Sequence, residues 1–329
     1  MSVPVIAFFN NKGGVGKTSL VYHVAYMAAE QGHRVVAADL DPQGHLTTRF
    51  LDEERLAELW PESSHAATIC GAVMRVKQKS KEIGAPVLER ISDRLTLIPG
   101  DMSFAEFEDD FSQAWSGCLD HDEQAFRVIS SLWRTIQHET ELHRGDVAFV
   151  DLGPNLGAIN RAALIASDFV VIPIVPDMFS VQGLRPLGSA IRSWRSEWKE
   201  RLARAPNSTS PLPGGEMRPL GYVVMQGAVR RERPSRFHGT WLNRIPAAYS
   251  TYVLGSEAPA AEQVTDDPHC LAILKHYRSL MPMAQEAGKP VFLLNVADGA
   301  LGAHTYAVKD AYADFQRLFL DILKRAGIR

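Results

Sequence analysis

The sequence has few cysteines and no long apolar run, and each shortage excludes a class of protein. Its three cysteines, Cys70, Cys118 and Cys270, lie far apart in 329 residues and form no CxxC pair. This spacing argues against a metal cluster and favours a reducing compartment. No uninterrupted apolar run approaches the roughly 18 residues that span a bilayer, and the N-terminus lacks the pattern of a secretory signal. We therefore expect a cytoplasmic protein.

The sequence also lacks an excess of charge of either sign. Lys and Arg number 35 against 38 Asp and Glu, which gives a formal net charge of −3. Any contact with nucleic acid must therefore come from a local basic patch and not from overall basicity. The hydrophobic content of 46% is ordinary for a globular protein, and the length is ample for a large core.

Short apolar runs alternate with helical patterns along the chain. Several of these runs end in an acidic residue or a glycine turn, which is where ligands bind in open α/β sheets. The pattern predicts an α/β fold with a doubly wound, mainly parallel sheet and helices on both faces. We expect a single domain over residues 1–329, with insertions near 51–94, 101–143 and 205–217. The predicted strands are Val5–Phe9, Arg34–Asp39, Leu95–Ile98, Asp146–Asp151, Phe169–Pro173 and Leu220–Met225.

A glycine-rich motif, KGGVGKT at Lys12–Thr18, separates the first apolar run from a helical pattern that ends at Gly32. A strand, a glycine loop and a helix N-terminus together form an anion-binding site, because backbone N–H groups point inward and the helix dipole favours negative charge. We expect Lys17 to reach the β- and γ-phosphates and the Thr18 hydroxyl to bind Mg²⁺. The motif therefore predicts a triphosphate–Mg²⁺ site.

The loop departs from the standard pattern GxxxxGK[ST] at one position. Asn11 stands where the first glycine would be, and Lys12 brings a second positive charge to the loop. A second cation can neutralise charge that develops on phosphate oxygens during phosphoryl transfer. The alternative is a chance glycine turn with two solvated lysines, which the flanking strand, the helix and the acidic residues downstream make less favourable.

Two acidic residues at predicted strand ends are candidates for the metal. Asp41, in the turn DLDPQG, can hold Mg²⁺ through water or orient the attacking water; alternatively, it only caps the turn. Asp151 ends an apolar strand, as a Walker B aspartate does, and can accept a hydrogen bond from a Mg²⁺-bound water or from Thr18. Thr18, Asp41 and Asp151 are therefore the predicted metal group.

The block Asn10–Thr18 resembles the signature of the ParA/MinD family of deviant Walker ATPases, which are P-loop NTPases of the SIMIBI type. In that family the early lysine crosses a nucleotide-sandwich dimer and touches the partner's ATP. The resemblance implies this role for Lys12, a close dimer contact at Gly13, and a catalytic role for Asp41 beside Lys12 and Lys17. Gln226 lies where the family's adenine-contacting residues cluster. The implied nucleotide-binding residues are Lys12, Gly13, Gly14, Val15, Gly16, Lys17, Thr18, Ser19 and Gln226.

The densest basic stretch of the chain lies between residues 230 and 236. Arginines in this stretch can neutralise DNA phosphates, and the region resembles a segment where several ParA proteins carry DNA-contacting residues. The alternatives are a solvated loop or a wall of the adenine pocket. A second, weaker candidate is the basic run from Lys77 to Lys81. The predicted DNA-binding residues are Arg230, Arg231, Arg233 and Arg236.

The resemblance implies an ATPase, with ATP and Mg²⁺ as cofactors, that forms a homodimer with ATP and then binds DNA nonspecifically. Slow hydrolysis would be stimulated by a ParB-like or other activating partner, and the role would be plasmid or chromosome partition, or cargo positioning, at the nucleoid. Two alternatives remain, a MinD-like membrane-cycling regulator and a nucleotide-gated interaction module. The final helical pattern, about Tyr306–Lys324, favours core packing over a membrane, because acidic residues dilute its polar face.

Overall fold

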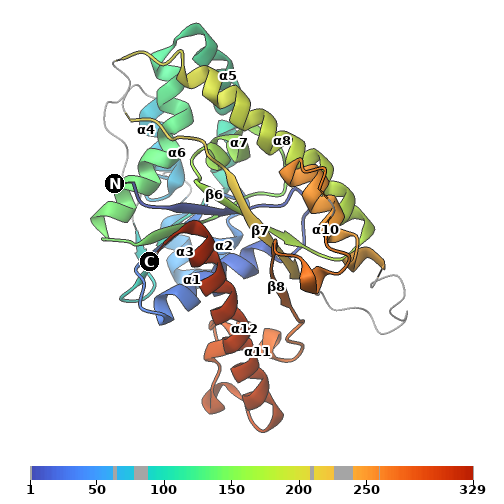
Figure 1. The fold of residues 1–329 in the computed structure, drawn as a ribbon. Coiled ribbons are helices and arrows are strands. Elements are labelled where there is room, and N and C mark those ends of the chain that lie inside the picture. The colour runs from blue at the N-terminus through green and yellow to red at the C-terminus, as the bar shows by residue number, and fades with distance from the viewer. Residues whose placement is uncertain are drawn as a thin grey trace.

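The computed structural model describes residues 2–61, 65–77, 88–207, 211–225, 240–258 and 260–328. Within these residues, one eight-stranded sheet has the order β3-β4-β2-β5-β1-β6-β7-β8 (Figure 1). Neighbouring strands are parallel, except that β3 runs antiparallel to β4 at one edge. This arrangement confirms the predicted doubly wound, mainly parallel sheet. The strands are β1 Val5–Phe8, β2 Val35–Asp39, β3 Glu89–Arg90, β4 Leu95–Ile98, β5 Val147–Asp151, β6 Phe169–Ile174, β7 Arg218–Met225 and β8 Cys270–Leu274.

Helices cover both faces of the sheet (Figure 1). One face packs against α1, α2, α11 and α12, and the other packs against α4 to α8 and α10. The α-helices are α1 Lys17–Glu30, α2 His45–Phe50, α3 Glu53–Leu59, α4 Ile69–Lys77, α5 Glu108–Gly117, α6 Glu123–Leu142, α7 Ala158–Ile165, α8 Met178–Leu202, α10 Ile245–Ala248, α11 Leu280–Glu286 and α12 Ala303–Ala326. Shorter helical turns are η1 Met102–Phe107, η2 Cys118–Asp120, η3 Tyr249–Leu254, η4 Val264–Asp266, η5 Val291–Leu293 and η6 Val296–Asp298.

The strand sequences follow from this two-sided burial. Val5 and Ala7 of β1 contact the core under α4 to α8, whereas Ile6 and Phe8 contact the core under α1 and α12. All four side chains are buried. A strand covered on both faces needs apolar residues at every position, which is why β1 is an unbroken apolar run and not an alternating one.

Two strands lack a clear apolar pattern in the sequence, and the start of one helix depends on a cap. β3 has only two residues, and the edge strand β8 is only partly buried, so neither produces a clear apolar signal. Helix α8 begins at Met178, where Asp177 caps it: its Oδ1 accepts the N–H of Ser180 at 2.8 Å. An N-cap of this kind extends a helix by satisfying N–H groups of its first turn.

The aromatic residues of segment 101–143 belong to the core, as their helical spacing predicts. Phe104 and Phe107 of η1 and Phe111 and Trp115 of α5 are all buried in the core. One side of α12, which includes Phe315, Phe319 and Ile322, is buried as well and packs against α1. No helix in the described part of the chain is both long enough and apolar enough to cross a lipid bilayer.

The order of the strands decides where a ligand can bind. The chain leaves β1 toward β2 on one side of the sheet, and β6, β7 and β8 follow on the other side. In the register, Asp151 lies beside both Phe8 and Asp39, so the carboxyl ends of β1, β2 and β5 meet at one edge. Crevices at such a reversal are where open α/β sheets bind ligands.

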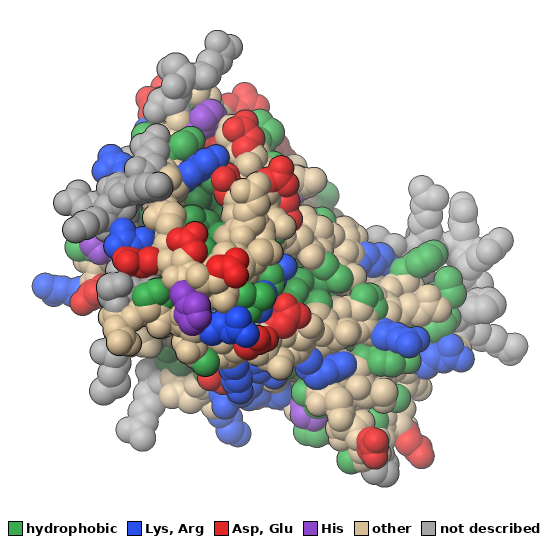
Figure 2. Space-filling model, turned by 90° about the horizontal axis from the view of Figure 1, so that it is seen from above, with side chains coloured by type: hydrophobic (Ala, Val, Ile, Leu, Met, Phe, Trp, Pro, Cys, Tyr) green, Lys and Arg blue, Asp and Glu red, His purple; other side chains and the backbone are tan. Residues whose placement is uncertain are grey.

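The surface carries charges of both signs. Acidic and basic side chains are both spread over the face in Figure 2.

Candidate nucleotide-binding site

A buried asparagine fixes the start of the glycine loop. Asn10 follows β1; its Nδ2 donates to the carbonyl oxygen of Pro173 at 2.7 Å, and its Oδ1 accepts the N–H of Lys12 at 2.9 Å. Pro173 belongs to β6. The loop is therefore held by the neighbouring strand at the point where it leaves the sheet.

Two glycines give the loop its shape. Gly14 and Gly16 have φ angles of 74° and 84°, in the left-handed region that other residues enter only at a cost of about 1–2 kcal/mol. Gly16 is the N-cap of α1, and its carbonyl oxygen accepts the N–H of Leu20 at 2.9 Å. The first N–H groups of α1 have no partner within the helix, so they are available to an anion held by the loop.

The loop borders a cavity of about 490 Å³. The lining also includes Tyr22 of α1, Arg49 of α2 and Lys289, which follows α11. The sequence patterns assign none of these three residues to the site. The guanidinium of Arg49 lies 5.1 Å from the centre of the Tyr22 ring. The predicted site residues that line the cavity are Lys12, Gly13, Gly14, Val15, Gly16, Lys17, Thr18, Ser19 and Asp41.

Asp151 lies at the end of β5, fully buried, and its Oδ1 is 3.7 Å from Nζ of Lys17. Burial raises the pKa of the Asp151 carboxyl, while the Lys17 ammonium and the neighbouring Thr18 hydroxyl act in the opposite direction. Within the described residues, neither carboxylate oxygen accepts a hydrogen bond of good geometry, so the Thr18 hydroxyl and the Lys17 ammonium satisfy this carboxylate only weakly. A buried carboxylate with such weak donors is costly, so this position fits a Mg²⁺ ion or a water bound to it.

Asp41 follows β2 and borders the same cavity. It is buried, and its Oδ1 accepts the N–H of Gln43 at 3.0 Å. A Cβ added at Gly153 would lie 3.3 Å from this oxygen, so the loops after β2 and β5 are in contact. The structure thus brings Asp41, Thr18 and Asp151 to one edge of the sheet, as the predicted metal group requires.

Asp39 is a second buried acid at this edge, and the sequence reasoning gives it no role. Its Oδ2 accepts the N–H of Thr47 at 2.8 Å and the hydroxyl of Thr47 at 2.7 Å. Burial, and after it the nearby Asp151 charge, raise the pKa of Asp39 to about 7. Because Thr47 lies in α2, Asp39 fastens the helix that follows Asp41 to the sheet. In the sequence Asp39-Leu40-Asp41, the acidic residue at the end of the apolar run is the signal that could have predicted this role of Asp39.

Lys12 is held within its own chain. Its Nζ lies 2.5 Å from Oδ2 of Asp177 and 3.2 Å from Oγ of Ser180, at the start of α8. Burial acts to raise the pKa of Asp177, but the hydrogen bonds from Lys12 and from the Ser180 N–H outweigh it, and the pKa is lowered. Sequence reasoning missed Asp177; the usable signal is an acidic N-cap before a helix.

The loop after β5 is braced from two helices. Nδ2 of Asn160 donates to the carbonyl oxygens of Gly153 and Asn155, both at 2.8 Å. Glu108, the first residue of α5, accepts the N–H groups of Ala158 and Ile159 at the start of α7. This loop carries Pro154 to the wall of the cavity, so α5 and α7 help to shape the site.

The remaining predicted site residues lie outside the described residues. These are Gln226, Arg230, Arg231, Arg233 and Arg236, together with Lys79 and Lys81 of the weaker basic run. Their roles stay predictions. The residue before Gln226, Met225, lines a second, apolar pocket of about 190 Å³ that shares Gly14, Gly16 and Ser19 with the glycine loop.

Comparison with known proteins identifies the family. A family model described as an AAA domain matches residues 3–204, which is more than half of the chain. The chain belongs to the ParA/MinD family of P-loop ATPases. Among ParA/MinD relatives, it is 31% identical to Protein IncC of Escherichia coli over 190 residues, covering 57% of this chain and 45% of IncC. It is 26% identical to the sporulation initiation inhibitor protein Soj of Bacillus subtilis over 196 residues, covering 57% of this chain and 64% of Soj.

The fold agrees with ParA/MinD structures over the whole chain. An ATP complex of a McdA variant from Cyanothece has a TM-score of 0.63 and covers 100% of this chain and 98% of its own, at 14% identity. A likeness at this identity concerns the fold alone. The chain spans about half the length of the curated relatives it matches. The family contains partition and positioning ATPases.

Proposed function

We propose that this chain is an ATPase that dimerises around two ATP–Mg²⁺ and binds DNA nonspecifically in that state. Its role would be plasmid or chromosome partition, or cargo positioning, at the nucleoid. The observation that carries the proposal is the convergence of Lys12, Lys17, Thr18 and Asp41 on one cavity around a glycine loop. The Lys17 ammonium, a hydroxyl and a carboxylate beside free helix N–H groups are suited to a triphosphate and its metal, and Lys12 supplies a second cation for the ATP of a partner subunit.

The residues that would contact the phosphates and the metal have distinct roles. The loop N–H groups and Lys17 bind the β- and γ-phosphates, and Thr18, Asp41 and Asp151 hold Mg²⁺ directly or through water. When bound, Mg²⁺ neutralises phosphate charge and orients the phosphates. Asp41 alone among these carboxylates borders the cavity, so we assign the orientation of the attacking water to it. The buried Asp151 carboxylate attracts the Lys17 ammonium, 3.7 Å away, and keeps it in place.

We propose that the adenine binds in the apolar pocket beside the loop. Its lining includes Met225 at the end of β7, Leu274 at the end of β8, and Tyr277 and Met281 just beyond. Base pockets are commonly apolar with a few polar groups. The pocket shares glycine-loop residues with the phosphate cavity, so one nucleotide can occupy both. Gln226, the residue after Met225, stays a candidate contact.

Dimerisation is supported by a glycine that the single chain does not need. Gly13 is exposed, its φ is not positive, and an added Cβ would meet nothing nearer than Pro154 at 3.9 Å. A side chain would therefore fit in the monomer. We propose that the space at Gly13 is required by a second subunit, whose arrival also draws Lys12 from Asp177 to the partner's ATP.

DNA binding is supported by a basic surface on described residues. Arg185 of α8 and Arg244 border a groove of about 600 Å³, and the Arg244 guanidinium stacks 4.6 Å from the centre of the Trp241 ring. Cationic and aromatic groups together suit a phosphate backbone. Trp241 and Arg244 of the groove lie a few residues after Arg230, Arg231, Arg233 and Arg236 in the sequence. We therefore propose that these arginines and the groove form one DNA-binding surface. The apolar side of α12 packs against α1, which disfavours the membrane alternative.

The proposal is tested by nucleotide binding and turnover. We expect purified protein to bind ATP with Mg²⁺ in calorimetry and to release phosphate slowly, faster with an activating partner, whereas Lys17→Ala does neither. A DNA-shift assay with and without ATP, run beside lipid co-sedimentation, separates the DNA-binding dimer from the membrane-cycling alternative. Binding of ATP without any phosphate release would favour the nucleotide-gated module. No heat or fluorescence change with ATP and Mg²⁺ would contradict the proposal altogether.

A further inference from the structure

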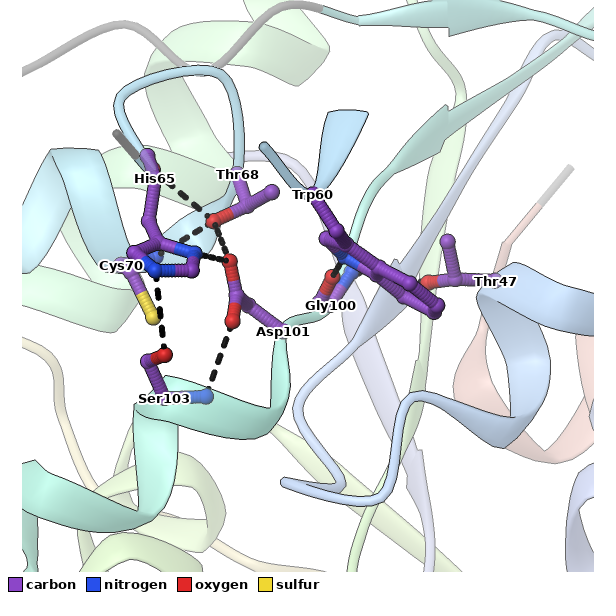
Figure 3. Close-up of polar contacts among 8 residues, drawn as sticks. All are labelled: Thr47, Trp60, His65, Thr68, Cys70, Gly100, Asp101 and Ser103. Atoms are coloured by element: carbon purple, nitrogen blue, oxygen red, sulfur yellow. Dashed lines mark hydrogen bonds and ion pairs between the residues drawn. The ribbon is translucent and has the colours of Figure 1, made fainter. Parts of the chain in front are cut away.

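The backbone of Gly100, just after β4, connects two separate parts of the chain. Its N–H donates to Oγ1 of Thr47 at 2.8 Å, and its carbonyl oxygen accepts the indole N–H of Trp60 at 2.9 Å (Figure 3). A Cβ at Gly100 would lie 2.8 Å from Cγ of Asp39, so no side chain fits there. Since Thr47 lies in α2, Trp60 is linked through the N–H and the carbonyl group of this single residue to the helix that follows Asp41.

The ring of Trp60 also covers the turn that carries Asp41. In this turn, residues 41–44, the N–H of Gly44 donates to the carbonyl oxygen of Asp41 at 2.9 Å, and Gly44 has a φ of 65°. A Cβ at Gly44 would lie 3.1 Å from Cζ2 and 3.3 Å from Cη2 of the indole. The turn therefore packs against the ring with no space for a larger residue, and the ring limits how far the turn can move.

Residues 65–69 are anchored to the same end of β4 that receives the Trp60 N–H. Oδ2 of the buried Asp101 lies 2.7 Å from Nδ1 of His65 and accepts the hydroxyl of Thr68 at 3.0 Å (Figure 3). The N–H of Ile69 donates to the carbonyl oxygen of Pro99 at 3.0 Å. Residues 65–69 are thus fastened to the end of β4, beside the Gly100 carbonyl group that accepts the Trp60 N–H.

We propose that Trp60 is a positioning residue that holds the Asp41 turn in the geometry needed for ATP turnover. It acts through Gly44 and through the backbone of Gly100, and the inference rests on the proposed ATPase function. Trp60 does not belong to the lining of the phosphate cavity or of the apolar pocket. Its loss should therefore lower kcat and leave nucleotide binding largely intact, because a small displacement of a catalytic group slows chemistry far more than it weakens binding.

The test compares the wild type with Trp60→Ala, Trp60→Phe and the control Trp133→Phe. Trp133 is another half-buried tryptophan, in α6 and away from the turn. We expect Trp60→Ala to lower kcat on the order of 10- to 100-fold with KM for ATP changed less than about threefold. Trp60→Phe keeps an aromatic ring without the N–H and should recover part of kcat, and Trp133→Phe should match the wild type.

Fluorescence gives a second readout that does not depend on turnover. Addition of a nonhydrolysable ATP analogue with Mg²⁺ should change tryptophan emission in the wild type and in Trp133→Phe, and the change should disappear in Trp60→Phe. Wild-type kcat in folded Trp60→Ala, or an unaltered signal in Trp60→Phe, would overturn the inference and leave the ATPase proposal standing. If Trp60→Ala fails to fold, the kcat of Trp60→Phe and its change in tryptophan emission test the inference instead. A wild type that neither binds nor hydrolyses ATP would contradict both proposals.

Discussion

A lysine that reaches a second subunit must first leave the contacts in its own chain. Lys12 is bound to Asp177 and Ser180, and the exposed fractions of the Lys12 and Asp177 side chains are 32% and 36%. An ion pair that water reaches this easily is worth at most about 1 kcal/mol. The contact can therefore orient Lys12 in the monomer and still give way to the phosphates of a partner's ATP.

Replacing Asp177 with Asn should make dimerisation easier. The amide oxygen still caps α8 by accepting the Ser180 N–H, but the charge that holds Lys12 is removed. We expect the dimer with a nonhydrolysable ATP analogue to form at a protein concentration lower by up to about fivefold, as measured by analytical ultracentrifugation. Asp310→Asn removes a comparable exposed pair with Lys275 and serves as the control. A weaker dimer in Asp177→Asn would mean that the pair guides Lys12 to its target.

His23 in α1 should make stability depend on pH. The ring stacks on Phe315, its Nε2 accepts the Val291 N–H at 3.2 Å, and burial lowers its pKa from 6.5 to about 4. Because the folded pKa is depressed, the unfolded chain binds the proton first as the pH falls. The contribution is complete above pH 6.5 and declines between 6.5 and 4, by about 3 kcal/mol in free energy of unfolding.

Denaturant unfolding at several pH values measures this effect. We expect the decline between pH 6.5 and 4 to be shallower in His23→Gln than in the wild type, whatever the absolute stability of the variant. The exposed His143, at the end of α6, supplies the control His143→Gln, whose decline should follow the wild type. Parallel curves for the wild type and His23→Gln would refute this account.

At the scale of elements, the features that can be predicted from the sequence are those determined by residues close together in the chain. The glycine loop, β1 and α1 occupy one short stretch, so the loop shape follows from local φ requirements and the helix start. Asp41 and Asp151 can be placed at one edge of the sheet from the sequence, because buried parallel strands end together there; their roles stay predictions. Asp177 and Trp60 were not found, since Lys12 and Asp177 are 165 positions apart and Trp60 meets Gly100 across 40. Such contacts depend on how elements pack, which no local pattern encodes.

The packing of α12 can be tested along one helix. Phe319 is fully buried, and its ring lies beside the ring of His33, in the connection between α1 and β2. The next residue, Leu320, is 50% exposed. We expect Phe319→Ala to lower the free energy of unfolding by about 3–5 kcal/mol and Leu320→Ala by less than about 0.5 kcal/mol. Chemical denaturation of both variants measures the difference. Equal, small losses would indicate that the apolar side of α12 is available to another surface, such as lipid.

At the scale of the whole molecule, the charge decides how DNA can be bound. A net charge of −3 gives no general attraction to a polyanion. Binding must then come from a few arginines that act together, and it should appear mainly when a dimer presents two such surfaces at once. Two linked surfaces bind far more tightly than one, because the second contact is intramolecular. Dependence on ATP would therefore arise from dimerisation, even if each arginine stays in place.

Reversing the charges at the groove should remove DNA retention. We expect Arg185→Glu with Arg244→Glu to weaken ATP-dependent DNA binding and to reduce the slope of log affinity against log salt by about 0.9 for each DNA phosphate that the protein no longer neutralises. Arg317→Glu makes the same kind of charge change at a 76% exposed site on α12 and should keep the wild-type slope. Arg230→Glu, Arg231→Glu and Arg233→Glu, combined in one protein, test the neighbouring stretch separately. Loss of retention in that triple variant with an unchanged slope in the double variant would place the DNA contacts on residues 230–233 and not on the groove.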